Sequence, residues 1–267
     1  MVVVLPTKNR EELRERILTA VQTMYAEVAS CPTRKFHFPT GRSACEYVGY
    51  PQNVLDLIPP HALESFAGVG YPFAAGVITK GMSVLDIGSG SGTDLIHSAF
   101  MVGPSGRVFG IDLTEEMISK GRASLEKAQI KNGEIKEGNA ESLPFPDNSI
   151  DVVTSNGVIN LVPNKKTAFQ EIFRVLKPGG KIQISDIVLA TEISEKSRAN
   201  PQLWAECIVG AVPEHAYIGL VRDIGFSDID IIGRIDYFSG SASDSTRKAA
   251  RQFGASSITL RGTKPRV

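Results

Sequence analysis

The chain has 267 residues, which fits one large domain or two small ones at ~150 residues per domain. Hydrophobic residues make up 42% and charged residues 22% of it, the balance of an ordinary globular protein. Its 29 Lys and Arg residues cancel its 29 Asp and Glu residues. Proteins that bind nucleic acid or an anionic membrane surface usually carry a basic excess. We therefore expect neither partner and favour a small-molecule substrate.

We predict no secretory or membrane segment. The apolar run at residues 2–5 is too short for a signal-peptide core, and a charged stretch follows it. No run approaches the ~18 apolar residues of a membrane-spanning helix, so we expect a cytoplasmic protein. The cysteines Cys31, Cys45 and Cys207 lie far apart without C-x-x-C spacing, which predicts neither a disulfide framework nor a metal site.

The first third of the chain is predicted to be helical. Apolar residues at steps of three and four predict a helix over residues 10–30. Prolines and a glycine predict a loop over residues 31–42, followed by short helical pieces over 44–66.

The middle of the chain alternates between strand-like and helix-like segments. Short runs rich in Ile and Val predict strands at 83–88, 107–112, 134–139, 149–156 and 180–190. Helix-length segments lie between them at 93–102, 114–129 and 165–176. This alternation predicts a parallel sheet with crossover helices. Beyond it we predict helices over 190–211 and 215–224 and strands over 228–235 and 256–261.

A glycine-rich turn follows the first predicted strand. Residues 84–92 read VLDIGSGSG, so the glycines have G-x-G-x-G spacing and not the G-x-G-x-x-G spacing of a dinucleotide site. Such a turn lets a ligand approach the backbone closely. Asp86, at the strand end, would repel a pyrophosphate and attract a cationic group. It would suit the amino group and the nearby sulfonium of S-adenosylmethionine (SAM).

Two further strand ends carry polar residues. Asp112 ends the second predicted strand, where an acid accepts hydrogen bonds from both ribose hydroxyls of a nucleotide. Asn139, or the backbone of Ala140, follows the third strand and would contact an adenine edge. The alternatives are that Asp86 and Asp112 cap turns and that Asn139 forms an Asx-turn.

Four segments together resemble the class I SAM-dependent methyltransferases. They are VLDIGSGSG, GIDLT, GNAESLPFPDNSIDVV and EIFRVLKPGGKIQISD, in this order and spacing. Four other stretches resemble arsenite methyltransferases and their bacterial relatives more closely. They read VQTMYAEVA, SFAGVGYPF, SNGVINLVPNK and LWAECIVGA.

The resemblance implies an α/β fold, a Rossmann-like seven-stranded sheet with one antiparallel strand. It implies SAM at the carboxyl ends of the strands, with S-adenosylhomocysteine (SAH) as product. We expect an N-terminal helical lid over 1–75, the SAM-binding core over 76–189, and acceptor-side helices with the last two strands over 190–267. The implied cofactor-binding residues are Asp86, Gly88, Ser89, Gly90, Gly92, Asp112, Leu113, Met117, Asn139, Ala140, Glu141 and Ser155.

The candidate catalytic residues are Asn156, Asp186 and Cys207. By resemblance, Asn156 faces the transferred methyl group. Asp186 ends the fifth predicted strand and is a candidate base. We expect in-line methyl transfer, in which the protein supplies proximity and orientation to an already activated methyl group. No obvious base is visible, which fits a soft, ionised or carbon nucleophile.

The cysteines depart from the arsenite methyltransferase pattern. That family holds As(III) with thiolates, but this chain has Val69 and Gly157 at two of those positions and keeps only Cys207. A soft trivalent ion needs two or three thiolates, so we expect a different small-molecule acceptor. The alternatives are a true arsenite methyltransferase that uses Cys207 with Cys31 or Cys45, and a non-catalytic SAM-binding protein.

Two other enzyme classes fit the sequence poorly. A short-chain oxidoreductase needs Tyr-x-x-x-Lys, and none of the six tyrosines has a lysine four residues on. A base-flipping nucleic-acid methyltransferase stacks its base with an Asn-Pro-Pro-aromatic turn, where this chain reads SNGV. We expect a monomer or a homodimer.

Overall fold

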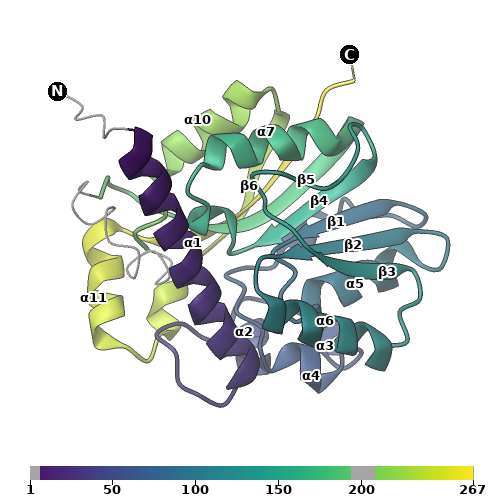
Figure 1. The fold of residues 1–267 in the computed structure, drawn as a ribbon, viewed down its shortest axis with the longest axis horizontal. Coiled ribbons are helices and arrows are strands. Elements are labelled where there is room, and N and C mark those ends of the chain that lie inside the picture. Colours follow the sequence, from purple (N-terminus) through teal and green to yellow (C-terminus); the bar gives the residue numbers. More distant parts are fainter. Residues whose placement is uncertain (1–6, 194–207, 267) are drawn as a thin grey trace.

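The fold is built around one seven-stranded sheet (Figure 1). A computed structural model describes residues 7–193 and 208–266. The strands are β1 (Ser83–Ile87), β2 (Arg107–Asp112), β3 (Gly133–Glu137), β4 (Ile150–Asn156), β5 (Leu176–Val188), β6 (Ser227–Ile235) and β7 (Ser256–Thr263). Their order is β3-β2-β1-β4-β5-β7-β6, and β7 alone runs antiparallel to its neighbours. The predicted Rossmann-like α/β sheet with one antiparallel strand is confirmed.

Helices cover both faces of this sheet. The longer ones are α1 (Thr7–Ser30), α5 (Thr93–Val102), α6 (Glu115–Lys127), α7 (Lys165–Val175), α10 (Glu214–Ile224) and α11 (Asp244–Phe253). The short ones are α2 (Arg42–Tyr47), α3 (Gln52–Leu55), α4 (Pro60–Leu63), η1 (Pro72–Ala75), η2 (Ile159–Leu161) and η3 (Tyr237–Gly240). Helices α5 and α6 lie on one face, and α7 and α10 lie on the other (Figure 1).

The crossovers fix where a ligand binds. The chain leaves β1 through α5 to β2 and through α6 to β3, but it leaves β4 through α7 to β5 on the opposite side. Right-handed crossovers running in opposite directions place their helices on opposite faces. β1 pairs in parallel with both β2 and β4, so the strand order reverses there. A crevice opens at such a switch point, outside the carboxyl ends of the strands.

The two faces of the sheet belong to two hydrophobic clusters. Val84 of β1 joins the cluster that contains α5 and α6, whereas Leu85 and Ile87 join the cluster that contains α7 and α10. Successive side chains of a strand point to opposite faces. The apolar runs of the predicted strands are therefore explained by burial on both sides, as expected for a parallel sheet.

Two predicted elements differ from the structure, and one helix was not predicted. β5 begins at Leu176, not residue 180, because its irregular start LKPGG still pairs with β4 across a register shift. The helix predicted over 190–211 is wrong at both described ends: residues 190–193 and 208–211 are not helical, and residues 194–207 lie outside the described part. Helix α11 was not predicted, although Ser243 caps its start by accepting a hydrogen bond from the Thr246 amide (3.2 Å).

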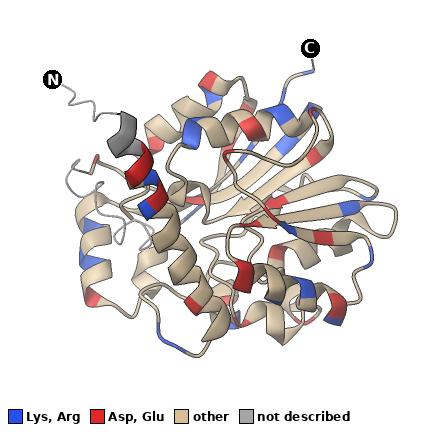
Figure 2. Ribbon diagram, in the orientation of Figure 1, with Lys and Arg blue, Asp and Glu red and all other residues tan. Residues whose placement is uncertain are grey.

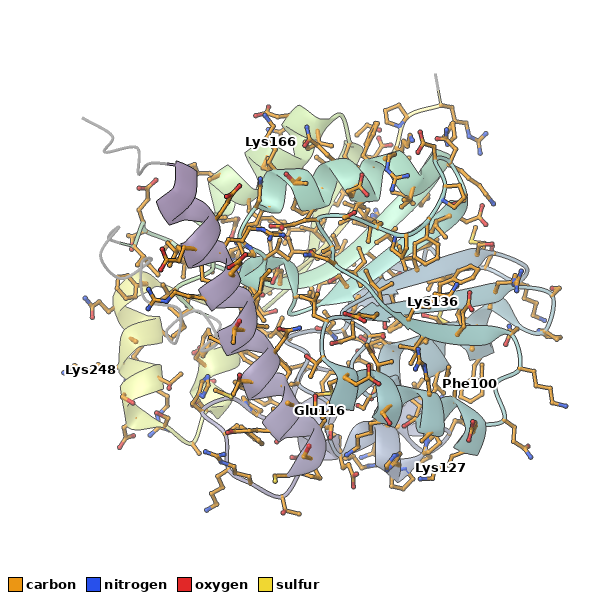
Figure 3. The ribbon with its side chains drawn as sticks, viewed as in Figure 1. Phe100, Glu116, Lys127, Lys136, Lys166 and Lys248 are labelled. Atoms are coloured by element: carbon orange, nitrogen blue, oxygen red, sulfur yellow. The ribbon has the colours of Figure 1, made fainter. Side chains whose placement is uncertain are left out.

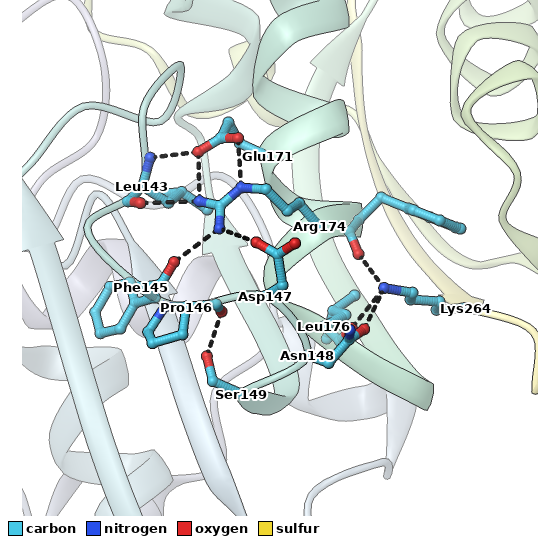
Figure 4. Close-up of polar contacts among 11 residues, drawn as sticks. Leu143, Phe145, Pro146, Asp147, Asn148, Ser149, Glu171, Arg174, Leu176 and Lys264 are labelled. Atoms are coloured by element: carbon cyan, nitrogen blue, oxygen red, sulfur yellow. Dashed lines mark hydrogen bonds and ion pairs between the residues drawn. The ribbon is translucent and has the colours of Figure 1, made fainter.

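A guanidinium in α7 holds the connection between β3 and β4 (Figure 4). Arg174 donates to the carbonyls of Leu143 (3.0 Å) and Phe145 (2.8 Å) and pairs with Glu171 and Asp147. The hydrogen bonds from Arg174 are the main reason that the pKa of Glu171 is lowered. The Arg174 guanidinium thus supplies hydrogen-bond donors to carbonyl groups that a proline-rich turn leaves without backbone partners.

Charged residues of both signs are spread over the helices and strands (Figure 2). Lys136, Lys166 and Lys248 are exposed, and Lys248 points away from the body of the molecule (Figure 3). Within residues 7–193 and 208–266, no helix is both long and apolar enough to span a bilayer.

Candidate cofactor and acceptor site

A cavity lies at the switch point between β1 and β4. Its walls come from α1, the segment before η1, the ends of β1, β2 and β4, and the residues after β3 and β4. It encloses about 990 Å³ of empty space, including its open mouth. The fold therefore places a cavity where the glycine-rich turn was predicted to act.

The turn after β1 forms the floor of this cavity. Gly88 has φ +71°, and its amide donates to the Ile111 carbonyl at 2.8 Å. A Cβ atom at this position would lie 2.3 Å from Val158 Cγ2. Only glycine fits there, because both the left-handed backbone and the close neighbour exclude a side chain. Ser89 and Gly90 also line the cavity, so the backbone itself is presented to a ligand.

Asp112, at the end of β2, braces the same turn. Its Oδ2 accepts a hydrogen bond from the Gly90 amide (2.9 Å), and its Oδ1 accepts one from the Thr114 amide (2.9 Å). Burial raises the pKa of Asp112, and the backbone hydrogen bonds lower it in part. A carboxylate oxygen has more than one lone pair, so this side chain can hold the turn and still accept from a ligand hydroxyl in the cavity. The alternative of a turn-capping role describes part of what Asp112 does.

Asp86 is the most unusual group in the cavity wall. It is 2% exposed, and its Oδ2 atom has no hydrogen-bond partner among the described residues. Burial raises its pKa well above the usual value, and the neighbouring charges of Asp94 and Asp112 raise it further. An unpaired buried carboxylate is unfavourable without a donor or cation beside it. The site is therefore incomplete until a ligand brings such a group.

The residues after β2 and β3 form the opposite end. Leu113, Met117, Asn139 and Ala140 all line the cavity. The Asn139 side chain accepts a hydrogen bond from the Glu141 amide at 2.9 Å. This is the Asx-turn raised as an alternative. Asn139 therefore has a structural partner and also lines the cavity.

Helix α1 closes one side of the cavity with Leu18, Val21 and Tyr25. Its position is fixed by polar contacts on both flanks. Gln22 Nε2 donates to the Leu113 carbonyl at 2.8 Å, and Arg14 is paired with Glu141. The helix therefore contributes wall residues and is fastened to the strand ends that it covers.

Comparison with known proteins agrees with this geometry. Residues 78–254 match the family model described as a methyltransferase domain. The chain belongs to the class I SAM-dependent methyltransferases. An arsenite methyltransferase of Halobacterium salinarum is 34% identical over 236 residues, which cover 85% of this chain and 59% of the relative. The predicted resemblance to the class I family, closest to the arsenite methyltransferases, is confirmed.

Further relatives extend the comparison. The crystal structure of an arsenic(III) S-adenosylmethionine methyltransferase from Chlamydomonas reinhardtii is 28% identical, with a TM-score of 0.63, over 86% of this chain and 75% of that one. A demethylmenaquinone methyltransferase of Listeria welshimeri is 41% identical over 109 residues, 41% of this chain and 46% of the relative. The chain thus spans about half the length of these curated relatives, and their acceptors differ.

Three of the predicted cofactor residues of this methyltransferase lie outside the cavity lining. Gly92 caps the start of α5. Glu141 is turned toward Arg14 and the Asn164 amide (2.7 Å). Ser155 is fully buried, and its hydroxyl donates to the Ile87 carbonyl at 3.1 Å. These three residues have structural partners or roles next to the cavity and do not line it.

Asn156 is the centre of a network that sequence reasoning missed. Its Oδ1 accepts hydrogen bonds from the amides of Val69 (2.8 Å) and Gly70 (3.1 Å). Its Nδ2 lies 3.1 Å from Asp94 Oδ2 and 3.0 Å from the Tyr50 hydroxyl, which itself donates to Asp94. Asp94 stands in the first turn of α5, two residues beyond the last glycine. The short distance in sequence between this acidic residue and the glycine turn was the signal that could have indicated the network.

We expect Asn156→Ala to release the segment at Val69 and Gly70. Two buried amides lose their acceptor, which should lower the free energy of unfolding by about 2–4 kcal/mol. Urea unfolding measures this, and hydrogen exchange at the two amides should quicken. Asn164→Ala is the control, because Asn164 caps α7 at an exposed site. Unchanged protection of both amides in the Asn156 variant would contradict this role.

Val69 and Gly157, the two positions where the sequence resemblance led us to expect cysteines, lie together. Gly157 has φ +76°, and a Cβ atom there would lie 3.0 Å from Val69 Cγ1. Val69 is buried, and Gly157 lines the cavity beside Val158 and Leu161. This part of the cavity is therefore walled by aliphatic groups.

The other cysteines are elsewhere. Cys45 is fully buried in α2, and burial, with the Asp94 charge, raises the pKa of its thiol strongly. Cys31 is exposed just beyond the end of α1. Neither belongs to the cavity lining, and Cys207 lies outside the described residues. No group of three or more His, Cys, Asp or Glu side chains in the described part of the chain is arranged to hold a metal ion.

Asp186 does not line the cavity either. It is fully buried in β5, where the Tyr217 hydroxyl donates to Oδ2 at 2.8 Å and the Ile187 amide donates to Oδ1 at 3.0 Å. Burial raises its pKa to about 7, although the Tyr217 hydrogen bond and the charge of Lys165 lower it in part. The geometry gives this candidate base a partner in α10 and leaves it outside the cavity lining.

We expect Asp186→Asn to stabilise the protein at high pH. The folded-state pKa of Asp186 lies above its unfolded value, so the native state loses stability as the pH rises toward 7. The amide variant avoids this loss, and its advantage should grow by about 3 kcal/mol between pH 5 and pH 8. Urea unfolding at both values checks this. Asp223→Asn, an exposed change in the same helix α10 as Tyr217, should show no such trend; parallel pH curves for wild type and the Asp186 variant would refute the assignment.

Proposed function

We propose that this protein transfers the methyl group of SAM in line to a small-molecule acceptor other than arsenite. The observation that carries the proposal is the cavity wall. It joins the Gly88–Gly90 turn, the unpaired carboxylate of Asp86 and the strand-end acid Asp112 in a single cavity. A cationic amino acid joined to a ribose and an adenine would satisfy all three.

The residues present fit SAM. Asp86 would hold its amino group, the amides of the glycine turn would face its carboxylate, and Asp112 would accept from its ribose hydroxyls. Leu113 and Met117 would pack on the adenine. When bound, SAM supplies a methyl group that its sulfonium has already activated.

The protein's own contribution is orientation and the exclusion of water. Helix α1 and the segment at Phe66 and Gly68 close over the strand ends, in keeping with the expected lid over residues 1–75. Within the described lining there is no histidine, lysine or arginine. The chemistry that suits this wall needs no proton removed by such a base, as with a soft, ionised or carbon nucleophile.

Arsenite methylation is the second candidate, because the curated relatives with that name are 34% identical and more. Against it stand the aliphatic pair Val69 and Gly157 and the position of the thiols. Burial keeps the Cys45 thiol protonated, and a protonated thiol is a poor ligand for a soft ion. We therefore place arsenite second.

Calorimetric titration with SAM, SAH and NAD⁺ tests the cofactor assignment. We expect SAM and SAH to bind with one site per chain and NAD⁺ not to bind, because its pyrophosphate would meet the Asp86 carboxylate. Failure of both SAM and SAH to bind would overturn the proposed function. Formation of SAH in the presence of an acceptor separates an enzyme from a non-catalytic SAM-binding protein.

A further inference from the structure

We propose that Asp94 is a second cation-facing carboxylate of the cofactor cavity, and that Asp94 and Asp86 together make the site select cationic SAM over its product SAH. This inference rests on the proposed function. SAM carries a sulfonium in addition to its amino acid group, whereas SAH has a neutral thioether in its place. The two ligands differ by one positive charge and one methyl group, so the charge of the wall decides between them.

The charge of the wall is one-sided. Asp86, Asp94 and Asp112 line the same cavity, and no Lys, Arg or His does so among the described residues. Asp86 is 2% exposed with one oxygen unpaired, and Asp94 is 6% exposed. The three acids are not clustered as metal ligands, since no such group exists in the described part. Their complement is therefore an organic cation of extended shape.

Asp94 is held rigidly in this wall. The Tyr50 hydroxyl donates to Oδ1, and Asn156 Nδ2 donates to Oδ2 at 3.1 Å. Both partners are neutral, so they orient the carboxylate without cancelling its charge. A fixed charge in a cavity of low polarity acts on a ligand charge more strongly than the same charge in water does.

The acids also repel one another before a cation arrives. Asp86 is faced by Asp94 from α5 and Asp112 from β2, with Tyr50 nearby and Tyr25 of α1 across the cavity. Burial raises the pKa of Asp94 to about 6, while its hydrogen bonds from Tyr50 and Asn156 lower it in part. Protonation of Asp94 below that pH weakens the attraction for the sulfonium. The preference for SAM over SAH should therefore fall as the pH falls.

The test is calorimetric titration of the full chain with SAM and with SAH at pH 5.5 and pH 7.5. We expect the affinity ratio of SAM to SAH to fall severalfold at the lower pH. In Asp94→Asn at pH 7.5, SAM affinity should drop about tenfold or more, with a smaller drop for SAH. Glu116→Gln is the matched control, an exposed acid in the first turn of α6 (Figure 3).

The outcomes separate this inference from the proposed function. If neither SAM nor SAH binds the wild type, the proposed function fails. If both bind but the ratio is the same at both pH values, or is unchanged by Asp94→Asn, the inference about charge selection is overturned while the function stands. The comparison of the wild type at the two pH values tests the inference about charge selection even if the Asp94 variant does not fold.

Discussion

Replacing Asp112 with alanine is expected to weaken SAM binding by about two to four orders of magnitude. Two ligand hydroxyls lose a charged acceptor, and each such hydrogen bond contributes about 1.5–3 kcal/mol. The amides of Gly90 and Thr114 lose their partner as well, so the glycine turn is no longer braced. Calorimetric titration with SAM measures the change directly.

Two further variants show whether the loss of affinity comes from the Asp112 carboxylate itself. Asp112→Asn keeps one carbonyl oxygen and should recover part of the affinity. Glu137→Ala is the control, because Glu137 is the partner of Asp112 in the β2–β3 register yet is exposed and lies outside this cavity. If Asp112→Ala bound SAM as tightly as wild type, Asp112 would have no role at the ribose.

The part of the site nearest the glycine turn was predictable because its parts are local in the sequence. A strand, a glycine turn and a helix follow one another within about twenty residues, and the parallel sheet then brings Asp112 and Asn139 to the same edge. Strand-end position is enough to place such residues, since the carboxyl ends of neighbouring parallel strands share one edge of the sheet.

The network around Asn156 was not predictable in this way. Tyr50, Asp94 and Asn156 are separated by 44 and 62 residues, and they come from a connecting segment, a helix and a strand. Each has an ordinary local role, so nothing in its neighbours indicates the others. Their meeting depends on how residues 42–75 pack over the sheet, which is a property of tertiary contacts and not of periodicity.

The roles of Asp186 and Glu141 were missed for a related reason. Position at a strand end predicted a cavity residue, but the partners that claim these carboxylates come from distant elements. Tyr217 of α10 donates a hydrogen bond to Asp186, and Arg14 of α1 forms an ion pair with Glu141. A carboxylate beside a hydrogen-bond donor turns toward it. The location of the donor therefore decides whether the carboxylate faces the cavity or a neighbouring helix.

If Val69 and Gly157 exclude arsenite from the acceptor site, cysteines at these two positions should make the protein bind As(III). Wild-type protein with SAM, a thiol reductant and As(III) should yield no methylated arsenic. Val69→Cys combined with Gly157→Cys should bind about one As(III) per chain, because two adjacent thiolates meet the lower limit for a soft ion. The pair is adjacent, since a Cβ atom at position 157 would lie 3.0 Å from Val69 Cγ1. Arsenic retained after gel filtration is the measurement.

Each single variant serves as the control for the pair. Either one adds a lone thiol to an aliphatic wall and should retain little arsenic, and Gly157→Cys should also lose about 1–2 kcal/mol of stability because of its left-handed backbone. Methylated arsenic from the wild type, with normal SAM binding, would instead show that Cys207 finds other partners. The absence of arsenic binding in the doubly substituted chain would show that Val69 and Gly157 do not determine the acceptor. SAM binding should survive in all of these variants, because none of them changes Asp86, Asp112 or the glycine turn, and this keeps a change of acceptor distinct from loss of the cofactor.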